Sequence, residues 1–285
     1  MSYDIISMKS IAADLNDRTF TDYYYRLMLI ARSVFKWNNL PNGIDEKWIE
    51  RYLFTEGNCL FFKDKEKGYI VTKCTPCDNL NYYDEPIKLK PYGTNYIGTE
   101  LVNNEECVLI RNNDCMLPTA PTIQLYALRL ADTTRAIDVN INAQKTPVTI
   151  MTNQKTRLSL VNAYKKVTGN EPVIYVDKSL DMDNIKVLNT EAPAVFDKLQ
   201  LQKHNIWNEC MSFLGINNAN MDKRERLVAD EVAANNDQIE ISAQVMLKAR
   251  EKACELINSV FKLETPISVE MRVMPEKVIK VGDEE

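Results

Sequence analysis

The sequence predicts an α+β protein in which long helices flank an inserted block of short strands. Three stretches carry apolar residues at helical spacing, at roughly 19–37, 118–144 and 193–214. Between the first two, short runs rich in β-branched and aromatic residues alternate with turn sequences such as DKEKG and KPYG. With 285 residues the chain is long enough to bury a sizeable core.

The N-terminal part, residues 1–57, is expected to be helical. Apolar residues surround most of the helix predicted from Thr19 to Trp37, which indicates burial on more than one side. A turn with Pro41 follows. Asp45 then has the pattern of an N-cap for a short helix that Gly57 would end.

Residues 58–112 read as a small β lobe. The runs CLFFK, GYIVTK, PIKLK, NYIGTELV and CVLIR are separated by regular turn signals, which predicts a small barrel or sandwich inserted between helices. Cys74 and Cys77 form a CxxC that is expected in a turn between two of these runs. Because no second ligand pair follows at zinc spacing, two ordinary thiols are favoured over a metal or redox site.

The remainder alternates helices with shorter elements. A helix at Pro118–Gln144 ends before Pro147, and strands with one short helix are expected up to about residue 190. A helix at Pro193–Leu214 and another at Gln238–Phe261 enclose a charged segment without Gly or Pro, and Ile267–Val273 reads as a strand. The predicted segments are 1–57, 58–117, 118–145, 146–190, 191–215, 216–237 and 238–285.

The sequence offers no constellation for catalysis. The one histidine, His204, has no accompanying nucleophile signature, and the eight glycines form neither a phosphate loop nor a dinucleotide motif. Seven cysteines in a long chain indicate reduced thiols. No apolar run approaches the ~20 residues that a membrane helix needs, so synthesis in the cytosol is expected. We therefore expect a protein that is not an enzyme and needs no metal or other cofactor.

The net charge of the chain and the spacing of its polar residues indicate how it could contact nucleic acid. A net charge of −5 argues against a tight grip on phosphates but is compatible with DNA that slides past. On the helix at 193–214 the spacings 4, 3, 4 and 3 place a polar stripe on one face: Lys198, Gln202, Asn205, Glu209 and Ser212. An ordinary surface helix and the lining of a channel both fit this stripe.

The segment from Asn217 to Asp237 holds a basic group at Lys223, Arg224 and Arg226. Without interleaved aromatic residues it cannot stack bases, although it can touch phosphates transiently. Composition is compatible with two alternatives, a surface loop without a role and a loop that projects into a bore.

Three long strings carry a family resemblance: NAQKTPV (142–148), EAPAVFDKLQLQKHNIWNE (191–209) and FLGINNANMDKRERLVADEVAANNDQIE (213–240). Together with Asn112–Asp114 and Pro118–Thr122, they resemble the upper collar, or head–tail connector (portal), proteins. These belong to small short-tailed phages with protein-primed linear genomes, of the picovirus type. The resemblance spans most of the chain.

The resemblance implies a phage portal fold and a homo-dodecameric ring at one capsid vertex. Long helices would form the channel wall, with an SH3-like β wing lobe, a β-containing clip and a helical crown. By similarity residues 1–57 would belong to wall and wing, 58–117 to the wing, 118–145 and 191–215 to the stem, and 146–190 to the clip. Residues 216–237 would form the tunnel loop and 238–285 the crown helix and tail.

Site residues and partners follow from the same resemblance. The family's channel lysines correspond to Lys198 and Lys203, and its basic tunnel-loop pair to Lys223 and Arg224. Lys203 lies about 100° round the helix from Gln202, off the polar stripe. The implied partners are further copies of the chain, double-stranded DNA in the channel, a packaging ATPase, the major capsid and scaffolding proteins, and the lower collar or tail protein.

A packaging RNA is not expected as a partner, because Met1–Asp17 holds only Lys9 as a basic residue where family members can carry a basic arm. The expected role is genome packaging and ejection, in a protein assembled in the host cytoplasm and located at the head–tail junction of the virion. The alternatives are another collar or tail component and, from a different class, a DNA-processing enzyme.

Overall fold

The computed structural model describes residues 8–144, 194–216 and 229–272. They divide into two compact units, which are treated separately: Met1–Thr19 with Leu130–Asn205, and Phe20–Arg129 with Ile206–Glu285. The predicted clip, 146–190, lies outside the described residues, as do positions 217–228. None of the helices within the described ranges is long and apolar enough to cross a membrane.

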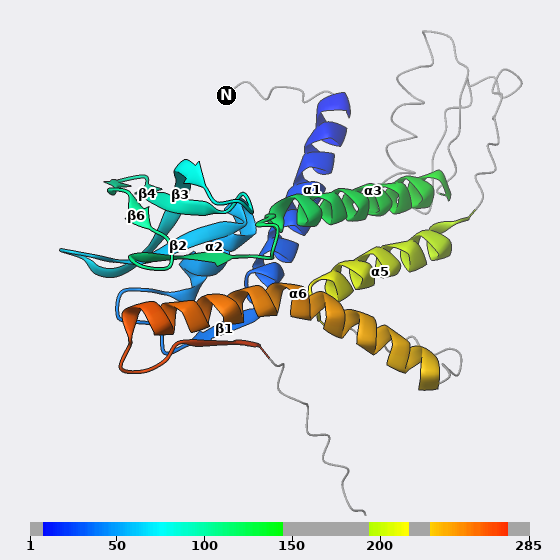
Figure 1. Ribbon diagram of the computed structural model, residues 1–285. Helices are drawn as coiled ribbons and strands as arrows, with labels where there is room; N and C mark the ends of the chain where they lie inside the picture. The colour runs from blue at the N-terminus through cyan, green and yellow to red at the C-terminus, as the bar shows by residue number, and fades with distance from the viewer. Residues whose placement is uncertain (1–7, 145–193, 217–228, 273–285) are drawn as a thin grey trace, which may run out of the picture. The chain divides into compact units, whose positions relative to one another are not determined.

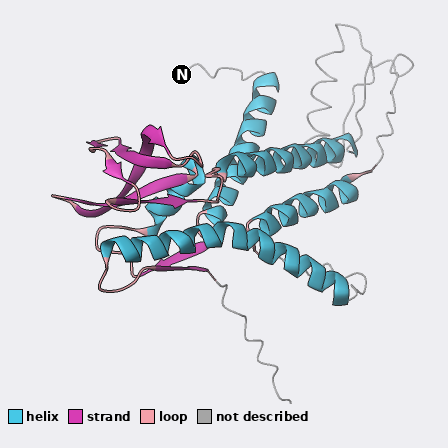
Figure 2. Cartoon of the chain, viewed as in Figure 1, coloured by secondary structure: helices cyan, strands magenta, loops and turns pink. Residues whose placement is uncertain are grey.

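The predicted β lobe is confirmed as a six-stranded antiparallel sheet in the second unit (Figures 1 and 2). Its path is β5-β4-β3-β2-β7, and β6 pairs with β4. The SH3-like character of this lobe stays a prediction. The strands are β2 (Asn58–Asp64), β3 (Gly68–Leu80), β4 (Pro86–Gly93), β5 (Tyr96–Ile97), β6 (Leu101–Val102) and β7 (Cys107–Arg111).

Strand β2, which lies between β3 and β7, is buried on both faces, which explains its unbroken apolar run. On one face a buried cluster is made by Leu60, Phe62, Leu89, Cys107 and Leu109. On the other face the Phe61 ring lies 5.3 Å from the Phe261 ring at the end of the last helix. The sheet therefore packs on one face against this buried cluster and on the other face against the end of α6.

The first helix differs from its prediction at both ends. It is α1 (Met8–Ala31), and residues predicted as its last turns form strand β1 (Phe35–Asn38). β1 pairs antiparallel with β8 (Ser268–Met271), with Phe35 opposite Met271 and Trp37 opposite Val269. Phe35 and Trp37 are buried while Lys36 is exposed, which is the alternation of a strand. The predicted strand near the C-terminus is confirmed by this pairing.

The short helix α2 (Glu46–Glu56) has the predicted caps. The Asp45 side chain accepts a hydrogen bond from the Lys47 backbone N–H at 2.9 Å. Gly57 ends the helix with φ 78° and donates its N–H to the Leu53 carbonyl.

The described ranges contain three further long helices: α3 (Ala120–Gln144), α5 (Phe196–Phe213) and α6 (Ala229–Phe261). α3 and α5 confirm their predictions. α6 begins at Ala229, well before the predicted Gln238. The loop predicted from 216 to 237 was therefore too long, because its last residues belong to α6. Residues 229–234 (ADEVAA) consist mostly of good helix formers, and the two asparagines that follow do not stop the helix.

Candidate nucleic-acid interface

The polar stripe of α5 is exposed in its first half. Lys198, Gln202 and Asn205, all in the first unit, are exposed, as the spacing predicts. Phe196 and Leu201 are exposed as well, at 41% and 58%. This part of α5 therefore presents polar and apolar side chains together rather than a purely polar face.

Lys203 differs from Lys198 in its surroundings. Its side chain is half-buried, in keeping with its place off the stripe, whereas Lys198 is exposed. His204 is half-buried too, and its Nε2 lies 3.2 Å from the Gln200 Nε2. Lys198 is thus the better placed of the two predicted channel lysines for contact with a passing anion.

Glu209, the last predicted channel residue, is tied to α3 within the second unit. Its carboxylate accepts hydrogen bonds from Tyr126 Oη at 3.3 Å and from Arg129 at 3.1 Å. Burial, with the neighbouring Glu209 as a further cause, raises the pKa of Tyr126 to about 12. Glu209 therefore links two helices, a role that the stripe did not reveal. Tyr126 and Arg129, at i and i+3 on α3, are the signal that could have indicated it.

A second polar group lies within the first unit. Arg135 contacts Asp138 at 2.8 Å and donates to the Asn16 side chain of α1 at 3.0 Å. Asn140 accepts from the Val195 backbone N–H just before α5, at 3.2 Å. The polar side of α3 thus holds α1 and the entry to α5 in place.

The predicted tunnel-loop residues Lys223, Arg224 and Arg226 lie outside the described residues. Their place in a tunnel loop and their role therefore stay predictions.

The prediction that the CxxC lies in a turn is wrong. Cys74 and Cys77 lie inside β3 and not in a turn, because β3 continues to Leu80 through a bulge. Residues three apart in a strand point to opposite faces, so the two thiols do not share a site. Burial raises the pKa of Cys74 to about 12, which leaves it a protonated thiol at neutral pH. Within the described ranges no group of three or more His, Cys, Asp or Glu residues could hold a metal ion.

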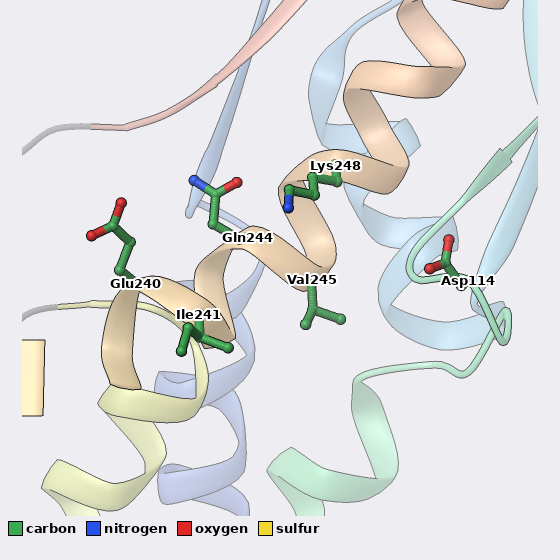
Figure 3. Close-up of a pocket in the computed structure, with 6 residues that line it drawn as sticks. All are labelled: Asp114, Glu240, Ile241, Gln244, Val245 and Lys248. Atoms are coloured by element: carbon green, nitrogen blue, oxygen red, sulfur yellow. The ribbon is translucent and has the colours of Figure 1, made fainter. Parts of the chain in front are cut away.

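The second unit also has a surface hollow of about 570 Å³ on α6 (Figure 3). Figure 3 shows its side chains spread along α6, with Asp114 on the loop after β7, so they do not converge on one point. A set spread out in this way offers a contact surface rather than a catalytic centre. It is lined by Asp114, Glu240, Ile241, Gln244, Val245 and Lys248.

Comparison with known proteins gives a family match and similar folds. A protein-family model described as Phage Connector (GP10) matches residues 2–274. A chain in the structure of the portal and tail of native bacteriophage P68 is 15% identical, with a TM-score of 0.52 over 96% of this chain and 94% of that one. This similarity shows that the two chains share a fold.

Two further structures are similar at lower TM-scores. One is an HK97-family phage portal protein from Corynebacterium diphtheriae, with 10% identity, a TM-score of 0.47 and coverage of 95% of this chain and 96% of that one. The other is the virion of a native gene transfer agent particle, with 11% identity, a TM-score of 0.43 and coverage of 93% and 84%.

Proposed function

This chain belongs to the phage connector family, and from that premise we propose that it is the portal of a short-tailed phage, the upper collar of the picovirus type. Twelve copies form a ring at one capsid vertex, at the head–tail junction of the virion. DNA enters the head through this ring during packaging and leaves through it during ejection. The observation that carries the proposal is the family match over residues 2–274, nearly the whole chain.

The helices supply the channel in this proposal. α3 and α5 form the stem, with Lys198, Gln202 and Asn205 of α5 facing the bore, and α6 forms the crown. The β lobe is the wing and residues 146–190 are the clip. Because α6 begins at Ala229, the tunnel loop is confined to the residues between α5 and α6, and it contains Lys223, Arg224 and Arg226.

The chemistry of such a channel is weak and transient contact. A ring multiplies the net charge of −5 per copy, which keeps duplex DNA from adhering to the wall. The exposed Lys198 adds one basic position per copy. An exposed ion pair contributes only about 0–1 kcal/mol, which suits brief phosphate contact and not a tight hold. Glu209 is engaged by Arg129, so it acts in the stem and does not face the DNA alone.

The partners proposed are those of a portal. A separate packaging ATPase drives the DNA, the major capsid and scaffolding proteins surround the ring, and the lower collar or tail protein joins it after packaging. The connector itself carries out no catalysis in this scheme.

In vitro packaging tests the proposal. Lys198→Ala and the double variant Lys223→Ala/Arg224→Ala should assemble normally and retain less DNA when the motor stalls. Lys65→Ala, which removes an exposed lysine in the β2–β3 turn, is the matched control and should retain DNA as the wild type does. Unchanged DNA retention in the first two variants would contradict the proposed role of these basic residues. Failure of the wild-type chain to support packaging would contradict the portal function.

A further inference from the structure

Two adjoining hollows on α6 form one groove in the second unit. The hollow of Figure 3, about 570 Å³, shares Asp114 and Val245 with a second hollow of about 510 Å³. The second hollow continues past the loop after β7 to Leu117 and to Thr122 in the first turn of α3. We name the two hollows together the α6 groove.

The α6 groove presents apolar side chains to solvent. Ile241 and Val245 lie on one side of α6 (Figure 3) and are 67% and 55% exposed. Ala243 between them is buried, because a step of two residues turns the helix by about 200°. Leu117, which lines the same groove, is exposed too. Apolar residues gathered at one place on a surface mark a site of contact with another molecule.

A ridge of matching character lies on α1. Tyr25 and Leu29, one helical turn apart, are 55% and 62% exposed, while Leu27 between them is fully buried. Apolar side chains at i and i+4 are the anchors by which an amphipathic helix enters an apolar groove. We name Tyr25 and Leu29 the α1 ridge. Within the described ranges, neither the α1 ridge nor the α6 groove is covered by other parts of the chain.

Charges of both signs flank the two surfaces. The groove carries Asp114, Glu240 and Lys248, and none of the three forms an ion pair with another described residue. Beside the ridge, Asp22 and Arg26 form an exposed pair at 2.7 Å, which is weak enough to exchange partners. Arg26 can therefore pair with a carboxylate of the groove and Asp22 with its ammonium. Two carboxylates to one ammonium disfavour nucleic acid as the occupant.

We propose that the α1 ridge of one copy packs into the α6 groove of a second copy. Ridge and groove are different surfaces, so the contact is head-to-tail and can repeat from copy to copy, as a ring requires. The choice of a second copy as the occupant rests on the ring in the proposed function. Leu125 and Leu128 of α3 are exposed as well, but α3 supplies a wall of the groove and so lies on the receiving side.

Two variants test the contact, each altering one of its surfaces. Leu29→Glu alters the ridge alone, and Val245→Glu alters the groove alone. Because every contact needs one ridge and one groove, either variant by itself should raise the dissociation constant between copies at least about tenfold. Ile97→Glu, which changes an exposed apolar side chain of β5, is the matched control and should associate as the wild type does.

Mixing the two variants makes the test specific for a head-to-tail contact. The Val245→Glu copy still has its ridge and the Leu29→Glu copy still has its groove, so an equimolar mixture should form dimers. These dimers should not grow, because the ridge and the groove that remain are the altered ones. Mass photometry measures the particle sizes, and denaturant unfolding checks that each variant keeps its fold. A mixture without dimers, variants that associate as the wild type does, or a wild-type chain that stays monomeric overturns the proposal.

Photo-cross-linking of the full chain is the second test. With p-benzoylphenylalanine in place of Tyr25, and isotope-labelled and unlabelled copies mixed, we expect links to residues 112–119 or 240–248 of another copy. The same photo-reactive residue in place of Ile97 should give no link to these ranges. Links only within one copy, links elsewhere in a second copy, or no link contradicts the proposal.

The portal function is scored separately. Electron microscopy of the wild-type chain shows whether a closed ring forms, and in vitro packaging shows whether the chain works as a portal. A ring that supports packaging without the ridge-to-groove link would overturn this inference alone. A wild-type chain that gives the link but supports no packaging would overturn the portal function alone.

Discussion

Arg250 of α6 and Glu50 of α2, 200 residues apart in the chain, form a two-armed ion pair in the interior of the second unit. The Arg250 Nε lies 2.9 Å from Glu50 Oε1 and its second arm 2.8 Å from Oε2, with both side chains no more than 3% exposed. Trp37 of β1 donates to the same carboxylate, and Asn112 accepts from the same guanidinium. One buried contact thus joins α2, α6, β1 and the end of the β lobe.

Removing one partner of this pair should be costly. Arg250→Met leaves the Glu50 carboxylate buried without its counter-charge, which destabilises by about 3–5 kcal/mol. The matched control is Arg129→Met, which breaks the more exposed pair with Glu209 and should cost about 0–1 kcal/mol. Denaturant unfolding measures both.

The double variant Arg250→Met/Glu50→Gln separates charge from packing. The amide oxygen introduced at position 50 can still accept a hydrogen bond from Trp37 Nε1. We therefore expect the double variant to recover part of the stability lost in Arg250→Met. Equal losses in Arg250→Met and Arg129→Met would show that the buried pair has no special role.

Gly215 should tolerate no side chain, because it ends α5 against α6. It has φ 75°, and a Cβ there would collide with the Cβ and Cα of Ala243. Gly43 has φ 95° with open space around it, so Gly43→Ala measures the backbone strain alone. We expect Gly215→Ala to lower the free energy of unfolding by at least about 1 kcal/mol more than Gly43→Ala. If the two variants lose similar amounts of stability, the collision between a side chain at 215 and Ala243 of α6 has no measurable effect, which contradicts this prediction.

Thiol alkylation at pH 8 should sort the cysteines by burial. Burial raises the pKa of Cys74 to about 12, and those of Cys107, Cys210 and Cys254 to the same value. About one molecule in 10⁴ then carries a thiolate at each of these positions. The exposed Cys115 should react first, as peptide mass spectrometry with iodoacetamide will show. Reaction of Cys74 at the rate of Cys115, or a disulfide between Cys74 and Cys77, would restore a redox interpretation.

Acid should weaken the base of the β3–β4 turn through Glu85. The hydrogen bond from Arg111, at 2.9 Å, and then that from Asn81 lower the pKa of Glu85 below its usual 4.5. A depressed folded-state pKa means that the stabilisation is fully present above about pH 4.5 and is lost as the pH falls through the lower folded value. Glu85→Gln should therefore be less stable than the wild type at pH 7, and the difference should be smaller at pH 3. An offset that is the same at both pH values contradicts the ion pair.

Local chemistry made part of the fold predictable. The caps of α2 depend on Asp45 and Gly57 alone, and the β lobe depends on short runs that pair with their neighbours in sequence. β1 depends on a partner more than 200 residues away, so Val34–Trp37 read as the continuation of a helix until its partner strand is known. The early start of α6 was missed because two asparagines were given more weight than the helix formers before them.

The candidate site divides in the same way. The exposure of Lys198, Gln202 and Asn205 follows from spacing along one helix, and it was predicted. The partners of Glu209 come from another helix, so a stripe counted along α5 alone could not show that Arg129 and Tyr126 hold it. The roles of Lys223 and Arg224 stay predictions.

A cryo-electron microscopy reconstruction of the purified full chain tests the central claim most directly. The account predicts a closed ring of twelve copies with an open axial channel, and with Lys198, Gln202 and Asn205 of α5 facing the axis. Particles that are only monomers or dimers, or a ring in which this face of α5 is buried between subunits, would contradict it.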